Sequence, residues 1–476
     1  MSKPRRIYLL SPKDLSPETI AVTFAKTSRS PKPFDEIAAE LTDERSAKFH
    51  EKWVVGYGHA SVAEHAVLHL ALENVSRLAI EEIEGNRLAS YTEKSTRYQQ
   101  WDDDAFYVPE EIKGHRLEQD YTDTCQNLFS AYQNSIPKVK AWLKHEQPQA
   151  ENENDQAYAR RIQPAAVDIC RFLLPAASLA NVGVTINARS LEYAICKMLS
   201  SPLEEVQSIG EKLREVGRLE TPTLIKYAAC NPYLVATREK MNAVTQGIST
   251  GDGVVDVNLI SWDQDGENAV LAAVLLRFGN AQSYQACYDF VIGLSEGDKD
   301  NLVHEIMDER GQFDQPLREL EYARMTFEVV MDQGAYFEFK RHRMMTQTVQ
   351  PLSADLGFAI PKGMTMSGCE TDYLEAIRQA GSLFRELRDW NPHVASYIIP
   401  NAFNRRVLFD MNLRQAYHLC RLRAAENAHF SIQRVALAMA EKIKAIYPCF
   451  GQYLDVPGDT TWQAVEKEYF SSIRSM

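Results

Sequence analysis

The sequence predicts an α+β protein made of two tandem, helix-rich copies of one domain, each with a small sheet. Two observations carry this prediction: an internal repeat with constant spacing, and alternating apolar runs that precede runs with helical spacing. The chain has 476 residues, of which 45% are hydrophobic and 10% aromatic. That length fits two or three domains, and the composition allows each copy its own core.

The repeat is clearest in two blocks that end in a long amphipathic helix. The first block spans residues 169–198 and the second spans residues 394–423. Pro175 and Pro400 lie 225 residues apart, and each is followed twelve residues later by an N-x-R sequence that begins the helix. Their common order and spacing indicate duplication of a segment with one fold.

A weaker match lies upstream in each copy. Strand-like runs at 66–75 and 324–330 each precede a helical stretch and a turn, and Arg87 matches Arg343 at an offset of 256. Because 256 exceeds 225 by 31, the first copy has 31 extra residues between its two blocks. The polar stretch 145–156 is expected to be an exposed part of this insertion.

The boundary between the copies is expected at the small-residue segment TQGISTGDG, residues 245–253. Residues 1–244 then form the first copy, with the polar insertion near 112–165, and residues 254–476 form the second. A helix is expected to be capped by Ser201, with Pro202 in its first turn, and another to end before Pro448.

Charge and cysteine usage exclude several classes of function. The formal net charge of −13 argues against a general nucleic-acid or membrane-surface binder, so any phosphate site must be a local arginine cluster. The eight cysteines form no CxxC pair, which fits reduced thiols better than a zinc site or a disulfide framework. The sequence has neither a signal-peptide run nor a membrane-length apolar stretch, so a cytoplasmic protein is expected.

Two short blocks could bind an anion. Ser95 and Arg97 lie two residues apart in a loop, where a hydroxyl and a guanidinium could face one phosphate. Arg341-His342-Arg343 places two guanidinium groups around an imidazole, which is costly without a nearby anion or acidic partner. The alternatives are a solvated polar loop and a surface basic patch.

The helix that begins at Asn412 carries a third polar group. Asn412 and Arg423 are eleven residues apart, about three turns, so they share a face. Arg414, His418 and Arg421 form an adjacent stripe. The alternative is an ordinary solvent-facing stripe, with His418 as a hydrogen-bonded structural histidine.

Taken in order, these blocks resemble the flavin-dependent thymidylate synthases. That family's signature RHRxxSxNExSxRY is preceded by a GHxSxxEH segment and followed by an ARxxLP block and an NxRxLxxFxxxR helix. The first copy has GHASVAEH (58–65), GNRLASYTEKSTRY (85–98), CRFLLP (170–175) and NARSL (187–191). The second copy has RHRMMTQTVQPLS (341–353), SYIIP (396–400) and NLRQAYHLCRLR (412–423).

Each copy departs from the signature in a different half. The first copy keeps Glu93, Ser95, Arg97 and Arg171, but has Gly85, Asn86 and Met198 where the family has Arg, His and Arg. The second copy keeps Arg341, His342, Arg343 and Arg423, but has Val349, Pro351, Ser353 and Ser396 in the other conserved positions. The family's nucleotide site is shared between two subunits, one giving the first set and the other the second. The resemblance therefore implies one complete composite site between the copies.

The resemblance also implies a role for each retained residue. Arg423 would stabilise the N3-deprotonated uracil as the catalytic arginine. The expected substrate contacts are phosphate contacts from Ser95, Arg97 and Arg341, sugar and base contacts from Glu93 and Arg171, and a contact from Glu338, which replaces the family's glutamine. The expected FAD contacts are Ser61, His342, Arg343, Asn412, Arg414 and His418. NADPH and methylenetetrahydrofolate are the implied co-substrates.

The leading hypothesis is flavin-dependent C5 methylation, or a related alkylation, of a pyrimidine nucleotide such as dUMP. No cysteine lies in a motif suited to attack C6 of the base, as the flavin-independent thymidylate synthases require. The alternatives are a catalytically degenerate nucleotide- or flavin-binding regulator and a scaffold without a ligand. Since the family works as a homotetramer, a homodimer of this chain would give a four-domain pseudo-tetramer.

Overall fold

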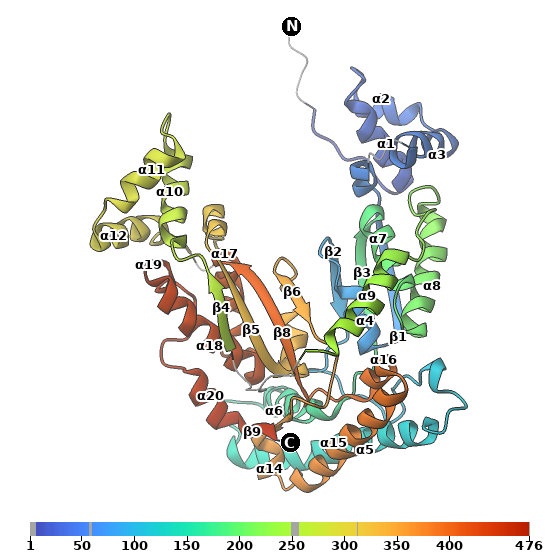
Figure 1. The fold of residues 1–476 in the computed structure, drawn as a ribbon, viewed down its shortest axis with the longest axis vertical. Coiled ribbons are helices and arrows are strands. Elements are labelled where there is room, and N and C mark those ends of the chain that lie inside the picture. Colours follow the sequence, from blue (N-terminus) through green and yellow to red (C-terminus); the bar gives the residue numbers. More distant parts are fainter. Residues whose placement is uncertain (1–5, 57–59, 249–256, 312, 476) are drawn as a thin grey trace. The chain divides into compact units, whose positions relative to one another are not determined.

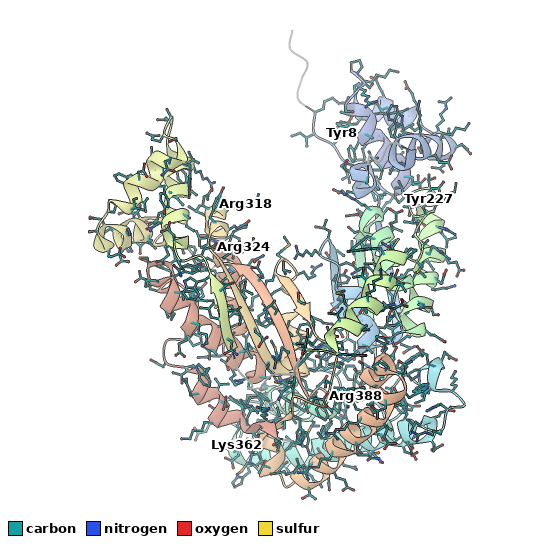
Figure 2. The ribbon with its side chains drawn as sticks, viewed as in Figure 1. Tyr8, Tyr227, Arg318, Arg324, Lys362 and Arg388 are labelled. Carbon is teal, nitrogen blue, oxygen red and sulfur yellow. The ribbon has the colours of Figure 1, made fainter. Side chains whose placement is uncertain are left out.

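The structure is a computed structural model that describes residues 6–56, 60–248, 257–311 and 313–475. The chain divides into two compact units. Figures 1 and 2 show its secondary-structure elements and its side chains. The first unit comprises Met1–Lys94, Phe106–Glu118 and Ala177–Thr250. The second unit comprises Ser95–Ala105, Gln119–Ala176 and Gly251–Met476. Each unit therefore draws on separate stretches of sequence, and the second includes part of the first copy.

The first unit contains an antiparallel sheet with the strand order β1-β3-β2. Its strands are β1 (Val67–Ser76), β2 (Ala89–Glu93) and β3 (Leu179–Asn187). Its helices are α1 (Pro17–Thr27), α2 (Phe34–Ala39), α3 (Asp43–His50), η1 (Glu51–Gly56), η2 (Ala60–His65), α4 (Arg77–Glu84), η3 (Glu110–Ile112), α7 (Ala188–Leu199), α8 (Glu204–Glu220) and α9 (Pro232–Thr245).

The second unit contains the sheets β4-β5-β8-β6 and β7-β9. Its strands are β4 (Val257–Trp262), β5 (Arg324–Asp332), β6 (Thr346–Val349), β7 (Phe358–Pro361), β8 (Asn404–Asn412) and β9 (Phe470–Ser475). The helices up to β5 are α5 (Glu118–Glu146, in this unit from Gln119), α6 (Asp155–Cys170), η4 (Arg171–Leu173), α10 (Gly266–Phe278), α11 (Tyr284–Ile292), α12 (Glu296–Met307) and η5 (Arg318–Tyr322). The later helices are α13 (Gln333–Phe339), α14 (Lys362–Met366), α15 (Glu370–Trp390), α16 (Pro392–Ala395), η6 (Ser396–Ile398), α17 (Leu413–Arg423), α18 (Phe430–Ile446), α19 (Pro448–Gly451) and α20 (Trp462–Tyr469). A continuous apolar core joins the larger sheet to α10, α17 and α18.

The two copies share one fold, as the sequence repeat predicts. The order β1-β3-β2 in the first copy corresponds to β5-β8-β6 in the second. Ser76 pairs with Leu179, and Asp332 pairs with Asn404, so the offsets of 256 and 225 hold at this end of the paired strands. The predicted strands at 66–75 and 324–330 are confirmed as β1 and β5. The prediction of tandem α+β copies with small sheets is therefore confirmed.

One irregularity separates the two sheets. The β1–β3 register shifts between Leu72 and Val75, whereas β5 and β8 pair without a shift. Asn74 lies at this bulge with φ 54°, and its backbone N–H donates to the Asn181 side chain at 2.9 Å. Asparagine tolerates left-handed backbone better than most residues, which allows β1 to hold one additional residue there.

The two proline blocks pair with each other inside the second unit. Pro175 and Pro400 form an isolated antiparallel bridge. The Ala176 N–H donates to the Ile399 carbonyl at 2.9 Å, and the Asn401 N–H donates to the Leu174 carbonyl at 3.0 Å. Residues 174 and 176 match residues 399 and 401 at the offset of 225, so the contact is reciprocal between the copies.

The inserted segment of the first copy belongs largely to the second unit. Residues 119–165 lie in that unit and include α5 and much of α6. The connection between the two helices, residues 147–154, is mostly exposed, as predicted for this polar stretch. The insertion therefore adds helices to the second unit and leaves the polar connection between them in solvent.

Smaller predictions had mixed outcomes. The helix expected to be capped by Ser201 begins at Glu204, because the Ser201 hydroxyl instead accepts the Leu203 N–H at 3.3 Å. Helix α18 ends before Pro448, as predicted. Residues 249–253 of the expected linker lie outside the described residues, and α9 reaches Thr245.

None of the helices in the described part of the chain has the length and apolar character to cross a membrane.

A substitution at Gly363 would test how the helices of the first copy pack against α14. A Cβ at Gly363 would lie 2.7 Å from Ile169 Cδ1 and 3.0 Å from Trp142 Cζ3. Overpacking of this kind costs about 1–3 kcal/mol, so Gly363→Ala should lower the urea midpoint of unfolding. The control is Gly458→Ala, since nothing lies within 4 Å of its added Cβ. Equal midpoints for the two variants would contradict this packing.

Candidate functional site

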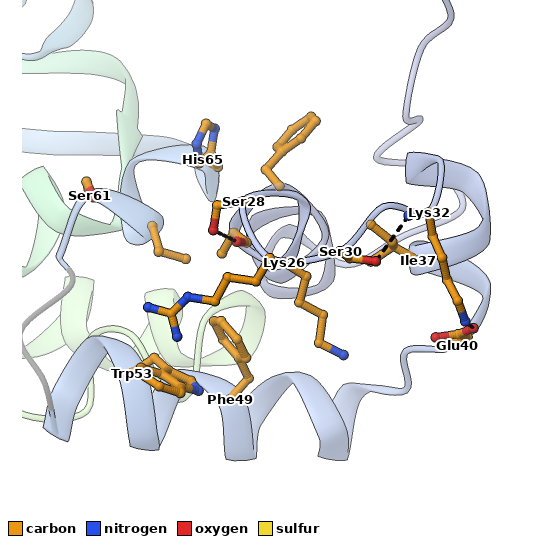
Figure 3. Close-up of a pocket in the computed structure, with 14 residues that line it drawn as sticks. Lys26, Ser28, Ser30, Lys32, Ile37, Glu40, Phe49, Trp53, Ser61 and His65 are labelled. Carbon is orange, nitrogen blue, oxygen red and sulfur yellow. Dashed lines mark hydrogen bonds and ion pairs between the residues drawn. The ribbon is translucent and has the colours of Figure 1, made fainter. Parts of the chain in front are cut away.

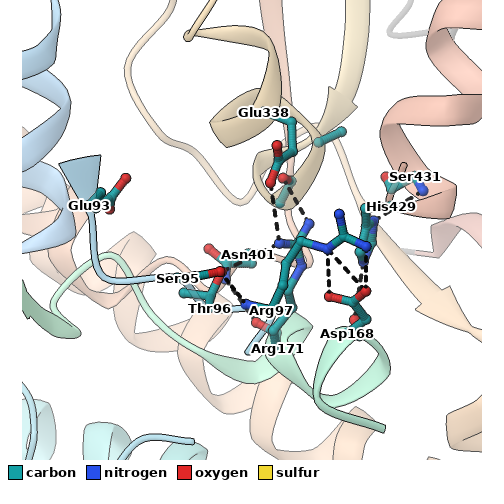
Figure 4. Close-up of polar contacts among 12 residues, drawn as sticks. Glu93, Ser95, Thr96, Arg97, Asp168, Arg171, Glu338, Asn401, His429 and Ser431 are labelled. Atoms are coloured by element: carbon teal, nitrogen blue, oxygen red, sulfur yellow. Dashed lines mark hydrogen bonds and ion pairs between the residues drawn. The ribbon is translucent and has the colours of Figure 1, made fainter. Parts of the chain in front are cut away.

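Charged residues from both sequence copies meet within the second unit (Figure 4). We call this group the arginine cluster; its members are Arg97, Asp168, Arg171, Glu338 and Arg423. Arg423 Nη1 donates to Glu338 Oε2 at 2.8 Å, and Arg171 Nη1 lies 4.0 Å from Glu338 Oε1. Glu338 on α13 thus links an arginine of the first copy to an arginine of the second.

Arg97 is held by an aspartate of the first copy. Its Nε donates to both carboxylate oxygens of Asp168 at 3.1 Å, and its Nη2 donates to Oδ2 at 3.0 Å. Burial raises the pKa of Asp168, against the attraction of Arg171 and Arg97. The fork-like pairing fixes the plane of the Arg97 guanidinium without covering every donor.

Arg171 is a buried cation with an unused donor. Its side chain is 1% exposed, and burial lowers its pKa. Nη1 donates to Thr96 Oγ1 at 3.4 Å and Nη2 to the Gly334 carbonyl at 3.2 Å. Nε has no hydrogen-bond partner among the described residues. A buried, unpaired N–H is costly, so this nitrogen is a candidate ligand donor.

Arg423 is oriented by two acceptors at the end of α17. Asn412 begins this helix with a capping box that includes Gln415. Eleven residues later, Arg423 Nε donates to His342 Nε2 at 3.1 Å, alongside its bond to Glu338. Burial lowers the pKa of His342 well below its usual value, and Arg423 and His418 lower it further. His342 is therefore neutral and accepts at Nε2.

The other predicted substrate contacts lie in different surroundings. Glu93 belongs to the first unit, where it pairs with Arg77 at 3.1 Å and both side chains are 3% exposed. Ser95 belongs to the second unit, and its hydroxyl accepts the Arg97 N–H at 3.2 Å. Arg341 is exposed. Ser95 and Arg97 thus share one turn, and Glu93 has a separate partner.

Ser61 lines a pocket of about 630 Å³ in the first unit (Figure 3). Aromatic rings of Phe24, Phe49 and Trp53 line the same pocket, with basic side chains that include Lys26 and Arg29. The Arg29 guanidinium lies 4.6 Å from the centre of the Trp53 ring. Aromatic surfaces, cations and hydroxyls together suit a ring-bearing anion.

The remaining predicted flavin contacts lie in the second unit. The His342 and His418 rings are 5.4 Å apart, and Arg343 is half-buried. Arg414 is engaged by Glu321 at 2.9 Å and by the Pro316 carbonyl at 3.0 Å. The Asn412 side-chain oxygen accepts the Gln415 N–H. Arg414 and Asn412 therefore already have structural partners.

Sequence reasoning missed Asp168, Thr96 and His429. Asp168 on α6 precedes Arg171, the C-cap of that helix, by three residues, so the helical spacing could have indicated that the two side chains are neighbours. Thr96 lies between two predicted residues. His429 has no motif, and histidine is not among the residue types preferred as helix N-caps, so no sequence signal indicated its role at the start of α18.

His429 joins the two copies beside the cluster. Nδ1 accepts the Ser431 N–H at 3.1 Å as the N-cap of α18, and Nε2 donates to the Asp168 carbonyl at 3.2 Å. Burial lowers its pKa well below the usual value, and Arg171 and Arg97 lower it further. Protonation would remove the acceptor at Nδ1, so the fold requires the neutral ring.

Stability should consequently fall in mild acid. Because the folded state depresses the pKa of His429, the unfolded chain takes up more protons below about pH 6.5. The histidine's contribution is complete above that pH and declines by about 1.4 kcal/mol per unit below it. His429→Gln should reduce the difference in unfolding free energy between pH 7.5 and pH 5.5, measured in urea. The control is His145→Gln, whose side chain is 85% exposed. An unchanged pH slope in His429→Gln would contradict the neutral cap.

Comparison with known proteins connects this geometry to a family. The model of the thymidylate synthase complementing protein family matches residues 10–223 and 258–449. A UPF0159 protein of Chlamydia muridarum is 29% identical over 437 residues, covering 87% of this chain and 82% of the relative. The UPF0159 protein Ta1429 of Thermoplasma acidophilum is 26% identical over 447 residues, covering 86% and 88%.

A shorter relative matches part of the chain. The flavin-dependent thymidylate synthase of Clostridium tetani is 26% identical over 215 residues, which cover 45% of this chain and 82% of the relative. One family model thus matches two successive regions, and a relative of about half the length aligns with less than half of the chain. The resemblance in the motifs is confirmed: the chain belongs to the thymidylate synthase complementing protein family, as a tandem pair of its α+β copies.

Proposed function

We propose that this chain is a flavin-dependent enzyme that methylates C5 of a pyrimidine nucleotide such as dUMP at one composite site. The arginine cluster carries this proposal, because Arg97 and Arg171 come from the first copy while Glu338 and Arg423 come from the second. Burying several charged groups is costly without partners or a ligand. The unpaired Nε of Arg171 supports a ligand over a scaffold without one.

The proposed phosphate contacts are Ser95, Arg97 and Arg341. Guanidinium groups bind phosphate through paired N–H donors, and the exposed Arg341 can move toward an incoming anion. Arg171 supplies a buried donor for the sugar or base. Glu93 is the proposed second contact of this kind, although its present partner is Arg77. The same charge pattern would suit other pyrimidine monophosphates.

Arg423 is the proposed catalytic residue. C5 of uracil is a weak nucleophile, and electron density must shift through the base before a carbon unit can be added. A fixed cation beside the base stabilises that shift most where water is scarce. The side chain of Arg423 is 15% exposed, and His342 and Glu338 hold it in one orientation. No reorientation is then needed during the reaction.

FAD is the proposed cofactor, and the chain offers suitable residues in both units. Ser61, with the aromatic and basic lining of its pocket, is a proposed contact in the first unit, and a volume of about 630 Å³ is typical of a cofactor site. The proposed contacts of the second unit are His342, Arg343, Asn412, Arg414 and His418. When bound, the reduced flavin supplies the hydride. NADPH and methylenetetrahydrofolate are the proposed co-substrates.

A regulatory protein that binds nucleotide or flavin without turnover is the second candidate. Glu338 and Asp168 favour it, because each already pairs with an arginine proposed to contact the nucleotide. A regulator of this kind would bind its ligand but show no product. Binding and turnover must therefore be measured separately.

The family relation is also the basis for a proposed assembly. Two chains would supply four copies and form a homodimer equivalent to a four-domain body. We place this enzyme in the cytoplasm, where reduced nicotinamide and folate co-substrates are available.

The purified protein should be yellow or become so with FAD. Trp53→Ala removes a ring of the pocket and should weaken FAD binding about tenfold or more, a magnitude typical of losing an aromatic stacking partner. Absorption and flavin fluorescence titrations would measure it. Trp390→Ala, which alters a partly exposed tryptophan of α15, is the control. A colourless chain that cannot be reconstituted with FAD would overturn the proposed function.

Arg423→Ala should abolish detectable conversion of dUMP, or reduce kcat by at least about a hundredfold, because one fixed electrostatic donor is lost. Arg189 lies in the first copy's repeat helix and corresponds to Arg414 at the offset of 225. It pairs with Glu64 in solvent, with the two side chains 51% and 41% exposed. Arg189→Ala should change kcat by less than about threefold. Equal losses in both variants, measured as product formed with reduced flavin present, would contradict a single composite site.

A further inference from the structure

Arg423 and Glu338 present an unused donor beside an unused acceptor. Arg423 uses Nε for His342 and Nη1 for Glu338 Oε2, which leaves Nη2 without a partner among the described residues. Glu338 Oε1 likewise accepts no hydrogen bond within the described part of the chain, since Arg171 Nη1 is 4.0 Å away. The two side chains are 15% and 10% exposed, so a ligand edge can reach them.

A neutral uracil edge has the matching pattern. Its N3–H is a donor flanked by the O2 and O4 acceptors, whereas the N3-deprotonated base has acceptors only. We propose that Glu338 selects the neutral base by accepting the N3–H hydrogen bond, while Arg423 donates to the adjacent carbonyl oxygen. This inference rests on the proposed function, since it takes the base to bind against Arg423.

The carboxylate is ionised when the base arrives. Burial alone would raise the pKa of Glu338, but Arg171, Arg423, Arg341 and Arg97 outweigh it and hold the pKa below its usual value. Asp168, which is paired with Arg97, and the neutral His342 also lie nearby, and the His418 ring is 5.4 Å from that of His342. A second anion at N3 would face the carboxylate directly, and like charges repel strongly where water is scarce.

Position 338 would then decide which form of the base is bound. A glutamine there carries no charge, and its amide can accept from N3–H or donate to a deprotonated N3. A glutamate can only accept. The chain would therefore draw its substrate from neutral pyrimidines with an N–H beside a carbonyl. Arg423 would then stabilise charge that develops on the carbonyl oxygen during the reaction, in place of the N3-deprotonated base that the family resemblance implies.

The test measures nucleotide affinity by calorimetry with the full chain, between about pH 7 and pH 9.5, where the phosphate remains a dianion. The ligands are dUMP and 5-fluoro-dUMP, whose fluorine makes N3 more acidic. For the wild type, affinity should fall about tenfold per pH unit above the N3 pKa of each free ligand. The fall should begin at lower pH for the fluorinated nucleotide.

Glu338→Gln should flatten this dependence to less than about threefold for 5-fluoro-dUMP over the same range. The control is Glu328→Gln, which alters a carboxylate paired with Arg406 at 3.4 Å and should keep the wild-type profile. A second probe of the wild type is 3-methyl-dUMP, which lacks the N3 donor and should bind at least tenfold more weakly than dUMP.

The outcomes separate this inference from the proposed function. A wild-type affinity that ignores N3 ionisation, or equal binding of 3-methyl-dUMP, would overturn the selection by Glu338 while leaving the nucleotide site intact. If the affinity for both nucleotides fell at the same pH, a protein group would be titrating rather than N3 of the base. That result would also overturn the selection by Glu338. Failure of the wild type to bind either nucleotide would overturn the proposed function itself.

Discussion

The reciprocal pairing of the two proline blocks is the contact on which the rest of the second unit depends. The backbone at Leu174 and Ala176 exchanges hydrogen bonds with Ile399 and Asn401, which are the equivalent residues of the other copy. Such self-complementary contacts normally join identical subunits. Here the contact lies within one chain, and Arg171 precedes it by only a few residues. Its carbonyl is also fixed by the Asn401 side chain at 2.8 Å, so the pairing sets the position of a buried cation.

The fold is duplicated, but its charges are not. At the offset of 225, Arg171 corresponds to Ser396 and Arg423 corresponds to Met198. Met198 is 2% exposed and Ser396 is 6% exposed, so both equivalents are buried without charge. A buried guanidinium is costly unless acceptors surround it, and only one set of positions has retained both cations and acceptors. Loss of the second set therefore removes a structural cost while leaving the shared backbone geometry unchanged.

The repeat predicted much of this arrangement, because register and helix position follow local spacing. The offsets of 256 and 225 recur in the strand pairs, and Arg423 ends the predicted helix. Long-range packing was not predictable in the same way. Nothing in the local pattern indicates that α5 and α6 join the second unit, or that Glu93 pairs with Arg77. Asp168 was missed because a single acidic residue on a helix carries no periodic signal, and its role depends on Arg97 arriving from a distant turn.

The net charge around Glu338 bears on which ionisation state of the nucleotide the cluster can bind. Four arginines act on this carboxylate, namely Arg97, Arg171, Arg341 and Arg423, and Asp168 is the second acid of the group. The four arginines and two carboxylates together have a net charge of +2. A nucleotide monophosphate carries about two negative charges on its phosphate at neutral pH, which this excess can match. A deprotonated base would add a further negative charge that exceeds the net positive charge of these six groups. The exposed Arg341 supplies one of the four positive charges that balance the phosphate. A proposed phosphate contact thus contributes to this balance from outside the buried part of the cluster.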